Sequence, residues 1–148
     1  FKYNMTDLQA ALGIRQLRRV EETWKTRRDI WHRYYEAFEK LPLTLLKFPK
    51  ENVTHGYHLF TIGVTSELTG TSRDKFMYEL HQRNIGGGVH YLSLPEHPYY
   101  QSKFDWNVSD FPAAARFGQS TLSLPLGSNL NHDDIDSVIA AVVDICRS

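Results

Sequence analysis

The chain has 148 residues, with 17 basic and 17 acidic side chains and a single cysteine. This length fits one domain of ordinary size, and a hydrophobic fraction of 41% is sufficient for a core. The charge balance gives no basic field that would attract nucleic acid or an anionic membrane surface. No apolar run approaches the ~20 residues of a membrane span, and one cysteine cannot form an internal disulfide, so we expect a protein of the reducing cytoplasm.

The N-terminal part of the chain carries apolar residues at a spacing of seven. Thr6 and Gln9 have the spacing of a capping box, which predicts that a helix begins there, and Pro42 ends the pattern. The sequence therefore predicts one long helix, or two nearly collinear helices, of roughly 35 residues in all. One small core cannot cover such a helix, so it must cross between two bodies or pack on a partner chain. We expect Trp24 or Trp31 to be among its exposed apolar residues.

The rest of the chain alternates short strand patterns with helical patterns. Strands are predicted at residues 43–48, 57–64, 89–92 and 121–124. One helix is predicted with Thr71 and Asp74 as its cap, another begins at Ser109 or Asp110, and Asn131 opens the last one together with Asp134. The aromatic segment 95–108 is predicted to be a loop.

These elements predict an α+β fold, in which a long N-terminal helix precedes a small, mostly antiparallel sheet with helices packed on one side. We divide the chain into a helix over residues 1–41, which would lie between domains or in a dimer interface, and a small α/β domain over residues 42–148. Together the two parts would form one structural domain.

Several patterns that could carry chemistry have simpler structural explanations. The pair His55 and His58 lacks the spacing of a known zinc site, so we expect no metal. No Gly-x-Ser-x-Gly motif is present, and Cys146 is interpreted as a small core residue. The arginine-rich stretch between Arg15 and Arg28 is interrupted by glutamates. It is therefore interpreted as a solvated or partner-facing helix side rather than a nucleic-acid groove.

A glycine run, Gly86 to Gly88, is followed by His90 and Tyr91. The run could form an anion-binding nest, but a helix C-cap and turn is favoured because glycine tolerates positive φ. Both His90 and Tyr91 can donate or accept hydrogen bonds, and they stand where a predicted strand meets a loop. The alternative, a tyrosine packed at a strand end beside a surface histidine, is equally compatible with the sequence.

Two segments together resemble the DegT/StrS family of sugar aminotransferases. Residues 1–13, FKYNMTDLQAALG, resemble the stretch where the family's large domain is followed by its small domain. Residues 84–91, NIGGGVHY, with the Leu-Pro and HPYY sequences that follow, are similar to a loop of the family's small domain. The LSLPL sequence at 122–126 and the closing amphipathic helix also fit, so the resemblance spans nearly the whole chain in order.

The resemblance implies the small, C-terminal domain of a fold-type I enzyme that uses pyridoxal phosphate and works as a homodimer. Such enzymes move an amino group, usually from glutamate, to a keto sugar attached to a nucleotide, and their products feed polysaccharide, glycan and antibiotic pathways. The catalytic lysine and the acid that pairs with the pyridine nitrogen would belong to a large domain preceding Phe1. We therefore expect no catalytic residue in this chain and no turnover by the chain alone.

The resemblance also implies roles for four residues. Where many members have asparagine and arginine in the opening segment, this chain has Lys2 and Asn4, near the place where the family's segment approaches the cofactor phosphate of the partner subunit. A lysine is a suitable point charge for phosphate and an asparagine a suitable hydrogen-bond donor. His90 and Tyr91 match the loop that approaches the sugar nucleotide.

Two other functions stay open on the sequence alone. The chain could be a non-catalytic interaction module that dimerises through its long helix. It could also belong to a pyridoxal-phosphate-dependent sugar dehydratase, since the residues that distinguish this reaction would lie in the large domain.

Overall fold

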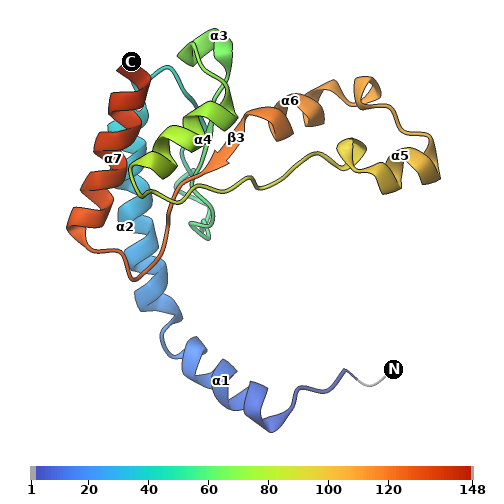
Figure 1. Cartoon of the computed structure of the whole chain (residues 1–148). Coiled ribbons are helices and arrows are strands. Elements are labelled where there is room, and N and C mark those ends of the chain that lie inside the picture. The colour runs from blue at the N-terminus through green and yellow to red at the C-terminus, as the bar shows by residue number, and fades with distance from the viewer. Residues whose placement is uncertain (1–2, 148) are drawn as a thin grey trace.

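The computed structural model describes residues 3–147 and has a mixed architecture of helices around a small sheet (Figure 1). The helices are α1 (Asp7–Leu17), α2 (Val20–Phe38), α3 (Ser66–Thr69), α4 (Arg73–Gln82), α5 (Pro98–Phe104), α6 (Pro112–Ser120) and α7 (His132–Arg147). Two short 3-10 turns, η1 (Leu94–Glu96) and η2 (Val108–Asp110), flank α5. The strands are β1 (Thr44–Leu45), β2 (Thr61–Gly63) and β3 (Thr121–Ser123).

The three strands form one antiparallel sheet in the order β1-β2-β3. In its register, Ile62 of the central strand lies opposite Leu45 on one side and Leu122 on the other. Helix α7 packs against α2 and α4, and α4 also contacts β3. The expected α+β fold with a small antiparallel sheet is confirmed, and we call these packed elements, α2, α4, α7 and the sheet, the body.

The core of the body is rich in aromatic side chains contributed by α2. Trp31 is only 1% exposed, and its ring centroid lies 5.3 Å from that of Phe60. Trp24 is half-buried and donates from its indole N–H to the carbonyl of His55 at 2.7 Å. The expectation that one of these tryptophans would be exposed is therefore wrong, because α2 turns this side of its surface toward the segment between β1 and β2.

Tyr34 is the most completely enclosed tyrosine of α2. Its hydroxyl donates to the carbonyl of Pro125 at 3.0 Å, and burial raises the pKa of Tyr34 to about 12. Near the end of α7, Cys146 packs against the core and burial raises its pKa to about 11. This agrees with its interpretation as a small core residue.

Within the N-terminal helical stretch, most of the exposed apolar surface lies on α1. The expected capping box is present, since Thr6 N–H donates to Gln9 Oε1 at 2.9 Å and Gln9 N–H to Thr6 Oγ1 at 3.3 Å. No residue of α1, all of which the structure describes, is buried. The large exposed side chains on this helix are Leu8, Leu12, Ile14 and Leu17.

The N-terminal helical stretch is divided in two. The residues between α1 and α2 are Arg18 and Arg19, and Arg19 has φ −107° and ψ 0°, outside the usual helical range. Figure 1 shows α1 leaving the direction of α2 and extending away from the body. The break lies in a run of good helix formers, so propensity did not predict it.

A second projection leaves the body between Val89 and Phe111 and returns through α6 (Figure 1). We call residues 89–111 the arm. The predicted loop contains helix α5, and the predicted strand at 89–92 is absent, because only a single bridge joins Gly88 to Ser123. At the tip, the ring of Trp106 stacks on Tyr100 at 5.4 Å. The arm therefore holds its own aromatic cluster, separate from the core of the body.

Two helix starts differ in detail from the sequence prediction, and a third agrees with it. Ser72 caps α4, with its hydroxyl accepting from Lys75 N–H, where Thr71 was expected. Helix α6 begins at Pro112, because a 3-10 turn occupies the positions where the helix was predicted to start. The start of α7 is confirmed: Asn131 and Asp134 exchange side chain-to-backbone hydrogen bonds of 2.9 and 3.0 Å.

Candidate functional site

The segment that carries His90 and Tyr91 begins where α4 ends. After Gln82 the chain turns at Asn84, which has a φ of 58°, and Ile85 N–H donates back to the carbonyl of Leu80 at 3.0 Å. The expected use of the glycine run for positive φ is therefore wrong, since Asn84 takes the left-handed conformation. A Cβ on Gly87 would lie 3.0 Å from Cδ1 of Leu122, so glycine here permits close approach to β3.

Ser123 of β3 holds this segment by three hydrogen bonds. Gly88 N–H donates to the Ser123 carbonyl at 3.1 Å, and Ser123 N–H donates to the Gly88 carbonyl at 2.8 Å. The Ser123 hydroxyl lies 2.9 Å from Nδ1 of His90. A Cβ on Gly88 would come within 2.7 Å of Cε1 of His90, so the histidine ring can occupy this position only beside a glycine.

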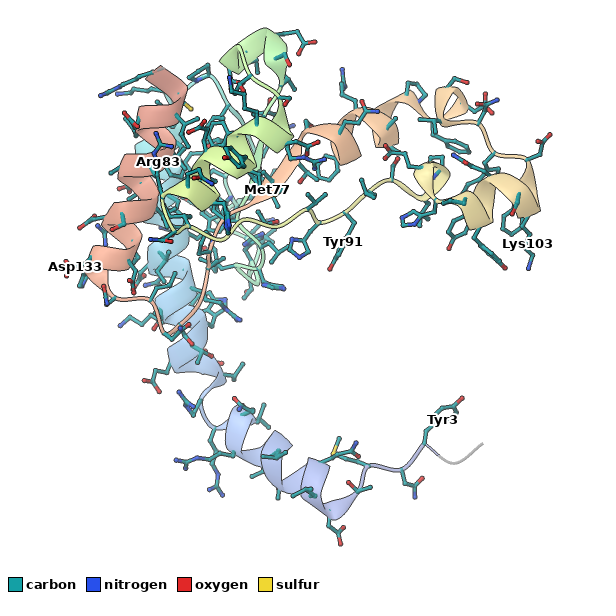
Figure 2. The ribbon with its side chains drawn as sticks, in the orientation of Figure 1. Tyr3, Met77, Arg83, Tyr91, Lys103 and Asp133 are labelled. Carbon is teal, nitrogen blue, oxygen red and sulfur yellow. The ribbon has the colours of Figure 1, made fainter. Side chains whose placement is uncertain are left out.

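His90 and Tyr91 lie side by side but in different environments. The His90 ring is half-buried, Tyr91 is 72% exposed, and their ring centroids are 4.8 Å apart in an edge-on arrangement. Figure 2 shows Tyr91 projecting from the ribbon between the body and the tip of the arm. The pair therefore offers one positioned imidazole and one accessible phenol, both able to bind the oxygen atoms of a ligand.

The residues after Tyr91 are fixed to α6. Ser93 N–H and its hydroxyl both bind Glu96 Oε2, and the hydroxyl of Ser93 lowers the pKa of Glu96. A Cβ on Gly118 would lie 2.8 Å from Ser93 N, so the start of the arm and α6 meet at very close range. This packing holds the root of the arm against α6.

Of the predicted cofactor-binding pair, one residue lies within the described chain, at the other projection. Asn4 is exposed and precedes the Thr6 cap, while Lys2 lies outside the described residues. In Figure 2 Tyr3, the neighbour of Asn4, is far along the chain from the body and is well separated from Tyr91. Within the described residues, Asn4 and the pair His90 and Tyr91 are thus presented on two separate projections.

A separate groove contains none of Asn4, His90 and Tyr91. It has a volume of about 760 Å³ and lies between the sheet, the start of α4 and α6. Its buried cation, Arg73, donates to the carbonyls of Gly118 and Thr121 at 3.3 and 3.1 Å. These are carbonyls at the C-terminal end of α6, where a cation stabilises the helix dipole, so Arg73 has a structural role.

His55 and His97 make separate contacts in different parts of the structure. His55 Nδ1 accepts from Tyr57 N–H at 3.1 Å, and the ring of His97 packs on Tyr100 in the arm. Within residues 3–147, no group of three or more histidine, cysteine or acidic side chains is arranged to hold a metal ion. Over the same residues, none of the helices combines the length and apolar character needed to cross a bilayer.

Residues 1–143 match the model of the DegT/DnrJ/EryC1/StrS aminotransferase family. The chain belongs to this family.

Two comparisons show what the chain resembles. It is 40% identical over 148 residues to the spore coat polysaccharide biosynthesis protein SpsC of Bacillus subtilis, which covers 99% of this chain and 38% of that protein. It superposes with a TM-score of 0.88 and 29% identity on Spr1654 of Streptococcus pneumoniae, assigned as a sugar aminotransferase and solved in a PMP form, over 97% of this chain and 36% of that one.

A third comparison supports the fold alone. PseC of Helicobacter pylori, an aminotransferase of pseudoaminic acid biosynthesis, gives a TM-score of 0.87 at 24% identity, over 99% of this chain and 39% of that chain. The chain thus spans less than two fifths of the length of each of these relatives.

Proposed function

We propose that this chain is the small, C-terminal domain of a cytoplasmic, pyridoxal-phosphate-dependent aminotransferase that transfers an amino group from glutamate to a nucleotide-linked keto sugar. Residues 1–41 would form the helical connection between domains and part of a homodimer surface, and residues 42–148 the small domain. The observation that carries the proposal is the family match, which covers residues 1–143 of this chain although the chain spans only 38% of SpsC.

The unburied helix α1 supports the same proposal. A helix with large apolar side chains and no buried residue has an unfavourable exposed surface when it is alone in water. Such a helix is stabilised when another domain or subunit covers it. A large domain with a catalytic lysine, outside this chain, would provide that cover.

The chain also offers groups that fit the cofactor's phosphate. Asn4 has an exposed carboxamide just before the N-terminus of α1, where donors and the helix dipole favour a negative charge. We propose that Asn4, together with Lys2, holds the phosphate of pyridoxal phosphate in the partner subunit. When bound, this cofactor supplies the electron sink that the amino transfer needs.

His90 and Tyr91 would bind the sugar nucleotide. Their position between the body and the arm allows a ligand to reach the exposed Tyr91 phenol and the half-buried His90 ring together. In this role they orient the substrate, and the proton transfers of the reaction belong to residues of the large domain.

The simplest experiment compares this chain with the longer protein that includes the large domain. Purified residues 1–148, supplied with pyridoxal phosphate, glutamate and keto-sugar nucleotides, should give no turnover above the non-enzymatic background, while the longer protein should be active. Turnover by the chain alone, or an inactive longer protein, would contradict the proposal.

Alanine variants of the longer protein then separate the two pairs of residues. Lys2→Ala and Asn4→Ala should weaken cofactor retention about ten- to a hundred-fold, as expected for a lost charge-assisted hydrogen bond, and leave folding nearly intact. His90→Ala and Tyr91→Ala should raise KM or lower kcat/KM while the cofactor stays bound.

Two exposed residues provide matched controls. Gln16→Ala removes a carboxamide from the opposite end of α1, and Tyr78→Ala removes an exposed tyrosine from α4. Both should retain cofactor and substrate affinity. If all four test variants behave like these controls, the binding roles are wrong, and if all four only melt earlier, the residues are structural.

A further inference from the structure

We propose that Ser123 is a positioning residue that fixes His90 as an Nε2–H hydrogen-bond donor toward the substrate. The proposal rests on the proposed function for the identity of the ligand, but its geometric part concerns this chain alone. It would assign a role in the site to a buried strand residue that has no direct access to the ligand.

The first argument is the burial and pairing of the Ser123 hydroxyl. Ser123 is 5% exposed, and its hydroxyl oxygen lies 2.9 Å from Nδ1 of His90. In the described part of the chain, this is the only hydrogen bond of the Ser123 side chain. A buried hydroxyl that accepted from an Nδ1–H would leave its own O–H without an acceptor, which is unfavourable.

The hydroxyl therefore donates to Nδ1, which must then be the unprotonated nitrogen of a neutral ring. In neutral imidazole the other nitrogen carries the proton, so Nε2–H becomes the donor that His90 can offer. A donor at this position suits an acceptor oxygen of the substrate, such as a phosphate oxygen or a sugar hydroxyl.

The second argument is that the backbone fixes the position of the two partners. Ser123 N–H and C=O both bond to Gly88, two residues before His90, with lengths of 2.8 and 3.1 Å. The ring of His90 also packs over the space that a side chain on residue 88 would fill. Ser123 thus fixes both the backbone at Gly88 and the tautomer of the His90 ring. A supporting group that acts in this way preorganises a binding residue.

The sheet offers a matched control in the same strand. Thr121 is 2% exposed, and its hydroxyl has no hydrogen-bond partner among residues 3–147. Thr121→Val and Ser123→Ala therefore each remove one buried hydroxyl from β3, but only the second removes a bond to His90. Ser123→Thr keeps a hydroxyl at the same position and tests rescue.

The test is nitrogen NMR of histidine-labelled 148-residue chain at a pH where the rings are neutral. We expect His90 to be in the Nε2–H form in the wild type and in Thr121→Val, to lose this preference in Ser123→Ala, and to regain it in Ser123→Thr. An Nδ1–H ring in the wild type would overturn the proposal without any variant. An unchanged His90 spectrum in folded Ser123→Ala would overturn it as well.

The ligand-facing half of the proposal is tested in the longer enzyme. Ser123→Ala should raise KM for the sugar nucleotide by about three- to ten-fold with little change in kcat, and Ser123→Thr should restore it. An unchanged KM despite the altered ring would overturn the substrate-facing role. An inactive longer wild type would instead contradict the proposed function, while the NMR result on Ser123 would be unaffected.

Discussion

The body and the two projections of this chain are stabilised in different ways. The body buries a continuous core against the sheet, in which Trp31, Phe38 and Phe60 are almost fully enclosed. Helix α1 buries none of its residues, and the arm has only a small aromatic cluster of its own. The body can therefore maintain its structure without a partner, whereas α1 has the surface of an element that another domain or subunit covers.

The largest expected difference comes from truncating matched apolar residues in the two regions. Trp31→Ala removes a core side chain that is 1% exposed and should lower the free energy of unfolding by about 3–5 kcal/mol. Leu12→Ala removes an exposed side chain of α1 and should change the free energy of unfolding by no more than about 0.5 kcal/mol. Urea denaturation of the two variants measures both values, and equal losses would show that α1 is part of the cooperative core.

A smaller effect is expected from pH. The pKa of Tyr34 is about 12 in the folded chain and 10.0 in the reference state, so above pH 10 the unfolded chain loses this proton first. Stability should consequently be lost between pH 10 and 12, by on the order of 2–3 kcal/mol from this group. The measurement should be made in a Cys146→Ala background. The pKa of the Cys146 thiol is raised from 9.0 to about 11, so this group would also lower the free energy of unfolding, and would do so at a lower pH than Tyr34.

Tyr34→Phe should flatten this alkaline decline and lower stability at neutral pH by about 0.5–1.5 kcal/mol through the lost bond to Pro125. Tyr78→Phe, an exposed tyrosine on α4, is the control and should retain the decline. Thermal or denaturant unfolding over the pH series tests the prediction. A Tyr34→Phe profile identical to that of the control would contradict it.

The root of the arm should respond to a single added methyl group. Gly118→Ala places a Cβ 2.8 Å from Ser93 N and 3.0 Å from Glu96 Oε2, so the start of the arm must move away from α6. We expect the free energy of unfolding to fall by about 1–3 kcal/mol. Gly13→Ala is the matched control, since its Cβ meets nothing within 4 Å and alanine favours the helix. If both variants were equally stable by thermal unfolding, the close packing at Gly118 would be unimportant.

The smallest effect on stability, but a large one on association, is expected on α1. Leu8→Glu combined with Leu12→Glu places charges on neighbouring turns of an exposed apolar side. The free energy of unfolding should change by less than about 0.5 kcal/mol, while self-association of the chain should become weaker. Sedimentation at high micromolar concentration tests this, with Leu68→Glu on α3 as the control. A strictly monomeric wild type would contradict the prediction.

The sequence predicted those elements whose signals are local. The Thr6 capping box and the start of α7 at Asn131 depend on residues three apart, and both are present in the structure. The burial of Trp31 was not predicted, because a seven-residue repeat identifies one side of a helix without saying what covers it. The break after Arg18 had no local signal. Helix α5 was not predicted, because prolines mark the segment as a loop, whereas one of them occupies the first position of the helix.

The candidate site was predictable only in part. The resemblance singled out His90 and Tyr91, but it could not reveal the partner of the ring. Ser123 is 33 residues from His90 in sequence, and the strand pairing at Gly88 is what brings them together. The glycine run was predicted to form the helix C-cap and turn, but Asn84 adopts the positive φ there, and the glycines that follow allow close contact with β3.

The aromatic tip of the arm also has a kinetic consequence. Its stacked rings, Tyr100 and Trp106, lie away from the core, and the root of the arm packs on α6 at Ser93. A segment tied in this way can open without disturbing the core, so its backbone amides exchange with solvent by local fluctuation rather than by global unfolding. The fluorescence of the Trp106 indole would change when the arm opens, whereas that of Trp24 and Trp31 would change only when the body unfolds. The opening rates of the arm and of the body could then be measured separately.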